Sequence, residues 1–227
     1  MLDNSRHDFR TTELDPDLLS TPFKVQTNWH VITGAPSCGK TTLIDQLADK
    51  GFQTVPETAH LYIEREMALG RRINEILMNR VDLQRILIEM QIGIEHELQV
   101  NEVIFLDRAL PDCLAFNRYV GLNPNGMLSE CFHHRYASVF ILDPLPFQAN
   151  GVRDHDSAVV DYLDEWLARD YSALGYRVVR VPVLAPKERL AFVLERLSGR
   201  GLQDGVSLTS WGRSDSVRLG LECVSVA

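Results

Sequence analysis

A glycine-rich octapeptide carries the clearest chemistry in the sequence. Residues 34–41 read Gly-Ala-Pro-Ser-Cys-Gly-Lys-Thr and match the pattern G-x-x-x-x-G-K-[ST] at every fixed position. The glycines allow a tight turn whose backbone N–H groups point inward, an arrangement that binds phosphate oxygens. Lys40 can reach the β- and γ-phosphates, and the Thr41 hydroxyl can ligate Mg²⁺. We therefore predict a site for ATP and Mg²⁺ built from Gly34, Ala35, Pro36, Ser37, Cys38, Gly39, Lys40, Thr41 and Thr42.

An acidic residue farther along the chain is also a candidate for this site. Asp107 directly follows residues 103–106, which read Val-Ile-Phe-Leu and are typical of a strand covered on both faces. A carboxylate at the end of such a strand can hold Mg²⁺ directly or through water. The alternative is an aspartate that only caps the next helix. Because the octapeptide is in the same chain, we predict that Thr41 and Asp107 are the metal ligands.

Alternating strands and helices must position these residues. Short apolar runs predict five strands, at 29–33, 52–55, 103–106, 138–142 and 176–181. Segments with an apolar face predict the helices, at 41–50, 59–69, 73–100, 111–119, 158–174 and 186–197. Strands separated by helices imply a parallel sheet covered on both faces. With the octapeptide, this order predicts an α/β fold of the P-loop NTPase type, a three-layer α/β/α sandwich with a five-stranded, mainly parallel sheet.

The two ends of the chain lack this alternation, so we place the domain at residues 27–197. Residues 1–26 are polar and aperiodic, and we expect a loose N-terminal extension. The alternative is a short helix docked on the body through Leu14, Leu18, Leu19 and Phe23. Residues 198–227 are rich in glycine and serine, and we expect a poorly ordered or peripheral tail. A reading-frame slip near residue 198 would explain the same change.

Composition excludes several classes of function. The net charge of −8 disfavours a grip on long nucleic acid, which depends on neutralising phosphates. No apolar run approaches the roughly 20 residues of a membrane span, and the N-terminus does not resemble a signal peptide. The four cysteines lie far apart without a C-x-x-C pair, which disfavours a zinc site or a disulfide scaffold. We expect a cytoplasmic monomer or homodimer without membrane contact.

Three segments of the chain resemble a known family. Residues 31–60, 103–116 and 175–197 look like the AAA_28-type group of AAA family ATPases, and the resemblance covers roughly residues 29–197. The contexts of Glu57 and of Asp107-Arg108 point to this group within the larger P-loop superfamily. The group is similar to deoxynucleoside kinases and to nicotinamide riboside kinase domains. The resemblance therefore implies a nucleoside- or nucleotide-kinase-like fold.

The resemblance also implies roles for individual residues. Glu57 follows the second strand, where deoxynucleoside kinases place a carboxylate that accepts the proton of the substrate hydroxyl; the alternative is an acid that favours a helix dipole. Arg108 would contact the transferring phosphate or the acceptor. Arg153 lies in the loop at the position of the superfamily's lid and would close over the phosphates, unless it is a solvated surface arginine. The expected catalytic residues are Lys40, Glu57, Asp107, Arg108 and Arg153.

Two hypotheses for the function follow. The first is a Mg²⁺-dependent kinase that transfers the γ-phosphate of ATP to a small, nucleoside-like acceptor. The second is a regulatory NTPase, or a nucleotide-binding protein without such an acceptor. A signalling GTPase is disfavoured because the chain has no N-K-x-D motif and Asp107 is not followed by the spacing D-x-x-G. The expected partners are a nucleotide and an unidentified small molecule.

Overall fold

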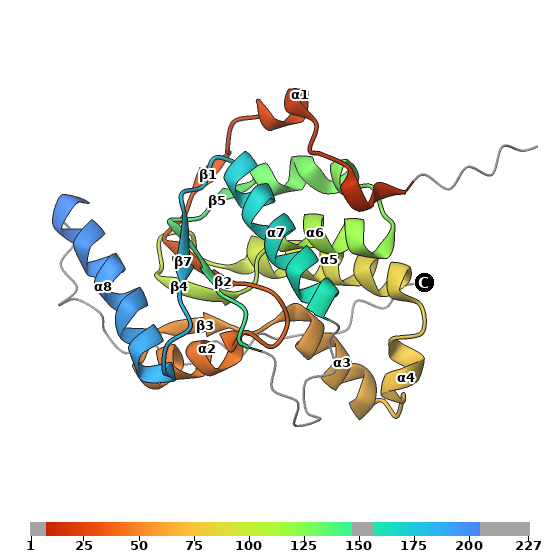
Figure 1. The fold of residues 1–227 in the computed structure, drawn as a ribbon, viewed down its shortest axis with the longest axis horizontal. Helices are drawn as coiled ribbons and strands as arrows, with labels where there is room; N and C mark the ends of the chain where they lie inside the picture. The colour runs from red at the N-terminus through yellow and green to blue at the C-terminus, as the bar shows by residue number, and fades with distance from the viewer. Residues whose placement is uncertain (1–7, 147–156, 205–227) are drawn as a thin grey trace, which may run out of the picture.

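A fully parallel sheet forms the centre of the molecule (Figure 1). The computed structural model describes residues 8–146 and 157–204. The five strands run in the spatial order β3-β4-β2-β6-β7, and every neighbouring pair is parallel. They are β2 (Trp29–Thr33), β3 (Gln53–Val55), β4 (Ile104–Asp107), β6 (Ser138–Leu142) and β7 (Val178–Val181). The predicted five-stranded sheet is confirmed, with strand bounds within two residues of those expected.

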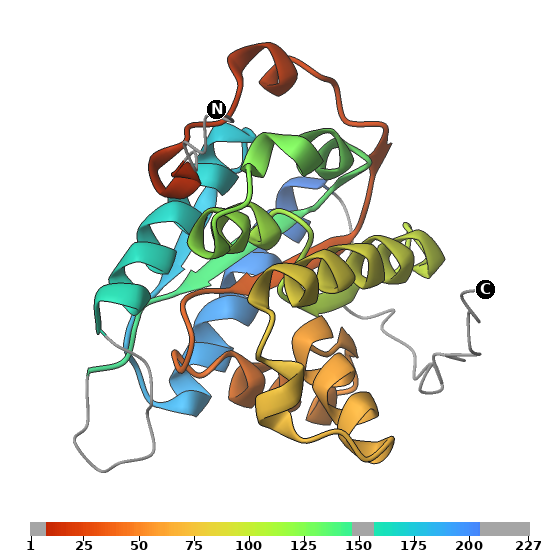
Figure 2. The same cartoon turned by 90° about the vertical axis from the view of Figure 1, so that its right-hand side faces the viewer.

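Helices cover both faces of this sheet, as the three-layer prediction requires (Figures 1 and 2). Successive residues of a strand point to opposite faces, so the apolar neighbours Val31 and Ile32 of β2 need a covering layer on each face. Ile32 joins the core with α2 (Lys40–Asp49) and α8 (Pro186–Asp204). Val31 joins the core with α5 (Arg80–Glu97), α6 (Asp112–Val120) and α7 (Ser157–Ala173).

The region between β3 and β4 departs from the predicted helices. The single helical stretch expected at 73–100 is wrong, because the chain forms two helices, α4 (Ile73–Ile76) and α5. The break occurs where the Asn79 side chain accepts a hydrogen bond of 3.2 Å from the backbone N–H of Asp82 and so caps the start of α5. The preceding helix α3 (Thr58–Ala68) agrees with its prediction and packs beside α5.

Smaller elements complete the described structure. The sequence did not predict the 3₁₀-helix η2 (Pro124–Phe132), nor the short parallel pairing of β1 (Val25–Gln26) with β5 (His134–Arg135). The C-terminal helix α8 extends to Asp204, seven residues beyond its expected end at Leu197, and the rest of the predicted tail lies outside the described residues. None of the described helices is long and apolar enough to cross a membrane.

The described part of the N-terminal segment packs on the body of the protein. It contains η1 (Phe9–Thr11) and α1 (Pro16–Leu19), seen in red and orange at the top of Figure 1. Leu14 is buried in the core, and the backbone oxygen of Thr12 accepts a hydrogen bond of 2.6 Å from Arg118 Nε. Leu18, Leu19 and Phe23 pack against the same core. Residues 8–26 therefore follow the docked alternative rather than the loose extension.

Candidate active site

The octapeptide forms the expected loop between β2 and α2. Gly34 has φ 142°, and a Cβ at this position would lie 2.8 Å from the backbone oxygen of Leu142, so a side chain does not fit. Gly39 has φ 91° and directly precedes the first residue of α2. The strand, loop and helix thus meet in the geometry that turns backbone N–H groups toward an anion.

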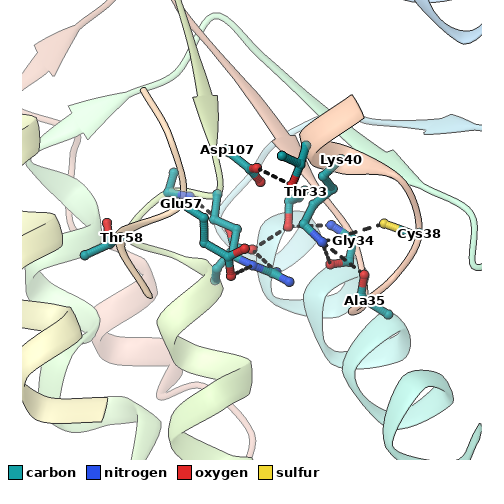
Figure 3. A network of polar contacts seen from close by, with 12 residues as sticks. Thr33, Gly34, Ala35, Cys38, Lys40, Glu57, Thr58 and Asp107 are labelled. Carbon is teal, nitrogen blue, oxygen red and sulfur yellow. Dashed lines mark hydrogen bonds and ion pairs between the residues drawn. The ribbon is translucent and has the colours of Figure 1, made fainter. Parts of the chain in front are cut away.

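Lys40 folds back over this loop (Figure 3). Its Nζ donates hydrogen bonds to the backbone oxygens of Gly34 at 3.2 Å and Ala35 at 3.1 Å, and the side chain is buried. Burial, together with the positive charge of Arg108, lowers the pKa of Lys40. Among the described residues, no carboxylate forms an ion pair with Lys40. Its charge therefore remains available to an incoming anion.

Asp107, one of the two predicted metal ligands, lies beside the other, Thr41, at the start of α2. Its Oδ2 accepts a hydrogen bond of 3.4 Å from the Thr41 hydroxyl. Its Oδ1 is buried and has no hydrogen-bond partner among the described residues. Burial, and next the negative charge of Glu57, raise the pKa of Asp107 to about 6. A hydroxyl next to an unpartnered carboxylate oxygen fits Mg²⁺, which prefers hard oxygen ligands.

Arg108 occupies an unusual backbone conformation at the end of β4. Its φ of 71° lies in the left-handed region, and its N–H donates to the oxygen of Ile32 at 3.0 Å. Its side chain forms ion pairs with Glu57 (Nε to Oε1, 2.8 Å) and Asp112 (Nη1 to Oδ1, 3.0 Å). Burial opposes the charge of Arg108, but the two carboxylates outweigh it and raise the pKa of the guanidinium.

Glu57, the ion-pair partner of Arg108, immediately precedes α3. Burial acts to raise the pKa of Glu57, but the charges of Arg108 and Lys40 prevail and lower it. The carboxyl is therefore ionised at neutral pH and able to accept a hydrogen bond from a hydroxyl group. Its side chain remains 30% exposed, so a ligand can reach it.

Asp112 is a site residue that the sequence reasoning missed. It is buried and accepts hydrogen bonds from the hydroxyl groups of Thr33 and Tyr171, the latter at 2.6 Å. It thereby joins the last residue of β2, Arg108 and helix α7. The helical spacing rule could not have identified the pair, because Arg108 precedes α6, which begins at Asp112, and has a left-handed φ of 71°.

A hollow opens next to the Glu57–Arg108 pair. Its cavity volume is about 70 Å³, and the hollow opens to solvent, so it contacts one part of a small molecule rather than enclosing the whole of it. Gln91, on its wall, is fixed by a hydrogen bond of 2.9 Å to Glu95 Oε1, and Glu95 in turn accepts the N–H of Leu110 at 2.9 Å. The remaining wall is mainly apolar. The lining residues are Glu57, Thr58, Ala59, Gln84, Leu87, Gln91, Arg108, Ala109, Asp112, Cys113 and Phe116.

The structure thus brings together most of the predicted site. Lys40, Glu57 and Asp107 meet at the carboxyl ends of β2, β3 and β4 (Figure 3). Thr41 joins them through its contact with Asp107, and Arg108 through its ion pair with Glu57. Parallel strands present their carboxyl ends on one edge of the sheet, which explains the convergence of residues from distant segments. The remaining predicted catalytic residue, Arg153, lies outside the described residues.

Comparison with known proteins agrees with this architecture. Residues 29–189 match the model of the AAA_28 family, described as an AAA domain. No curated protein matches the chain by sequence. Among solved structures, NadR in complex with NR has a TM-score of 0.57 and 19% identity, over 76% of this chain and 51% of NadR. Deoxyadenosine kinase from M. mycoides has a TM-score of 0.52 and 14% identity, over 76% of this chain and 99% of that enzyme. The chain therefore spans about half the length of NadR and shares the P-loop kinase fold with both.

Proposed function

This chain belongs to the AAA_28 family, and we propose that it is a Mg²⁺-dependent kinase that transfers the γ-phosphate of ATP to a hydroxyl of a small, nucleoside-like acceptor. The observation that carries the proposal is the hollow beside Glu57 and Arg108. A protein that only hydrolyses or binds a nucleotide needs no second site for a small molecule. Here a carboxylate that can receive a proton lies on the wall of such a site, next to the phosphate-binding loop.

In this proposal the loop side of the site binds the nucleotide phosphates and Mg²⁺, and the Glu57 side binds the acceptor. The loop amides and Lys40 bind the β- and γ-phosphates. Thr41 and Asp107 are the residues that would hold Mg²⁺, which supplies charge neutralisation at the phosphates when bound. Arg153 remains our sequence-based candidate for a residue that closes over the same phosphates.

Glu57 acts on the acceptor. Its ionised carboxylate accepts a hydrogen bond from the acceptor hydroxyl and takes the proton as the hydroxyl oxygen bonds to the γ-phosphorus. The bond between that phosphorus and the β–γ bridging oxygen breaks, and ADP leaves with the electron pair. Arg108 orients the carboxylate through its 2.8 Å contact and is itself held by Asp112.

The lining of the hollow favours a flat acceptor with a polar edge. Phe116 and Leu87 supply apolar surface, and the side-chain amide of Gln84 supplies a polar group, whereas the amide of Gln91 is already bonded to Thr58 and Glu95. The solved relatives support this choice, since NadR was crystallised with NR and deoxyadenosine kinase with dCMP and dCDP.

A panel of nucleosides tests the proposal. Each is incubated with the protein, ATP and Mg²⁺, and mass spectrometry follows the gain of one phosphoryl group, with Lys40→Ala as the inactive control. We expect one class of nucleoside to be phosphorylated and ADP release to depend on it. ADP release at the same rate with and without every acceptor would contradict the kinase and leave a hydrolase.

A further inference from the structure

Glu95 is a buried carboxylate on α5, one helical turn beyond Gln91 on the wall of the hollow. The residue is 2% exposed, so its oxygens need partners inside the protein. Its Oε1 accepts hydrogen bonds from the side-chain amide of Gln91 and from the backbone N–H of Leu110, each at 2.9 Å. Its Oε2 accepts one of 2.8 Å from the Tyr136 hydroxyl and lies 3.8 Å from His134 Nδ1. A single oxygen atom therefore holds both a side chain of α5 and the backbone after β4.

The side-chain amide of Gln91 connects Glu95 to the backbone beside Glu57. Because Glu95 Oε1 is the acceptor of this contact, the amide turns its NH₂ toward Glu95 and its oxygen the other way. That oxygen accepts a hydrogen bond from the hydroxyl of Thr58. Thr58 is the first residue of α3 and directly follows Glu57. The start of α3, and with it the backbone of Glu57, is therefore fixed against α5.

The backbone N–H of Leu110 connects Glu95 to the turn that carries Arg108. The left-handed φ of 71° at Arg108 is a conformation that a residue other than glycine keeps only where its surroundings hold it. Both of the next two N–H groups are held by buried carboxylates. The N–H of Ala109 donates to Asp112 Oδ2 at 3.1 Å, and the N–H of Leu110 donates to Glu95 Oε1. Glu95 thus fixes the turn from which the Arg108 side chain extends.

We propose that Glu95 is a positioning residue for phosphoryl transfer, which sets the geometry of the Glu57–Arg108 ion pair through its single oxygen Oε1. The inference rests on the proposed function, because Glu95 acts only through the proton acceptor Glu57. Both members of the ion pair adjoin a segment that this oxygen holds, so its loss displaces both. A displacement of about 1 Å at a reacting group can lower the rate about a hundredfold. Within the described residues, none of the hydrogen bonds to Glu95 comes from the phosphate-binding loop, so nucleotide affinity should not depend on it.

Turnover of Glu95→Leu, alone and combined with Glu57→Gln, tests the inference. The substrates are ATP with Mg²⁺ and a mixture of the common ribo- and deoxyribonucleosides, and mass spectrometry follows the phosphorylated product. We expect Glu95→Leu to lower turnover about tenfold or more, but by no more than Glu57→Gln does, and to change the affinity for AMP-PNP less than about twofold. In the Glu57→Gln background the same substitution should lower turnover less than about twofold further, because residues that act through one group are not additive.

Three further variants complete the test. Glu95→Gln should retain turnover within about threefold, because an amide oxygen can replace Oε1 while the NH₂ donates to the Tyr136 hydroxyl oxygen. Glu97→Leu is the matched control and should equal the unmodified protein, since Glu97 is exposed on the same helix. Thr58→Val removes the hydroxyl that bonds to Gln91 and serves if Glu95→Leu does not fold. It should lower turnover about fivefold alone and less than about twofold in the Glu57→Gln background.

The outcomes separate the inference from the function on which it rests. An equal further loss in both backgrounds, with Glu95→Leu or with Thr58→Val, would show a general structural role and overturn the inference while the kinase proposal stands. Unchanged turnover of these two single variants would overturn it in the same way. If the unmodified protein phosphorylates none of the nucleosides, the proposed function fails and the inference fails with it.

Discussion

The phosphate-binding loop and the acceptor hollow, the cavity beside Glu57 and Arg108, are built in different ways. The loop consists of consecutive residues, and the contacts of Lys40 within it are to backbone oxygens no more than six residues away. The acceptor hollow draws its walls from three helices, with Thr58, Gln91 and Phe116 on α3, α5 and α6. Recognition of an anion can thus be encoded in one short segment, whereas the shape of a substrate pocket requires the assembled fold.

The two regions also differ in how their cations are used. Within the described part of the chain, the Lys40 ammonium donates its hydrogen bonds to two backbone oxygens and to the Cys38 sulfur at 3.7 Å, and it forms no ion pair. The Arg108 guanidinium is already paired with two carboxylates. We therefore expect Lys40 to bind phosphate and Arg108 to position Glu57. The sequence had suggested instead that Arg108 contacts the transferring phosphate or the acceptor.

The largest effect should come from the loop. Lys40→Ala removes the unpaired cation that faces the phosphates, and we expect kcat/KM to fall by about a thousandfold, as when one preorganised donor is lost elsewhere. Lys50→Ala, at the exposed C-terminal end of α2, is the matched control and should retain activity. Steady-state kinetics measures both. Comparable activity of the two variants would contradict the role of Lys40.

A second large effect should come from the carboxylate of the acceptor hollow. Glu57→Gln keeps the size of the side chain but removes the acceptor of the proton, so kcat should fall about a hundredfold. The affinity for AMP-PNP should change by less than about twofold, because the ion pair that Glu57 forms among the described residues is with Arg108 and not with the loop. Glu64→Gln, an exposed position on α3, serves as control. Equal losses in turnover and nucleotide affinity would remove the proposed role.

A glutamine variant should test the acceptor hollow directly. Gln84 lines this hollow. We expect Gln84→Met to raise the KM of the acceptor about tenfold and leave the KM of ATP unchanged. Initial rates with each substrate varied in turn measure both constants. If the variant changes the two constants equally, the assignment of this hollow to the acceptor is wrong.

The contrast between the regions also explains what the sequence could predict. Apolar runs and the G-x-x-x-x-G-K-[ST] spacing are local signals, so the parallel sheet and the position of Lys40 followed from them. The break at Asn79 depends on a side-chain cap that competes with a continuous helical pattern. The role of Asp112 depends on neighbours distant in the sequence, namely Thr33 and Tyr171. Such contacts exist only once the fold has assembled them.

The smallest predicted effect concerns stability, and it arises at Asp107, between the two regions. Its pKa of about 6 lies above the ordinary value of 3.8 in the unfolded chain. The folded state therefore holds a proton that the unfolded state releases, and the free energy of unfolding falls as the pH rises from about 4 to about 6 and levels off above that range.

Asp107→Asn removes this titration, so it should raise the melting temperature of the metal-free protein at pH 7 by a few degrees, corresponding to about 1–2 kcal/mol, and by much less at pH 4. Scanning calorimetry at the two pH values in the presence of a chelator measures the difference, with Asp45→Asn as the exposed control. Saturating Mg²⁺ should reverse the order at pH 7, because the ion binds the ionised carboxylate of the unmodified protein. Equal melting temperatures of the two chelated proteins at pH 7 would show that the Asp107 carboxylate bears no burial cost. Equal stabilisation of both proteins by Mg²⁺ would show that the ion is held by ligands other than Asp107.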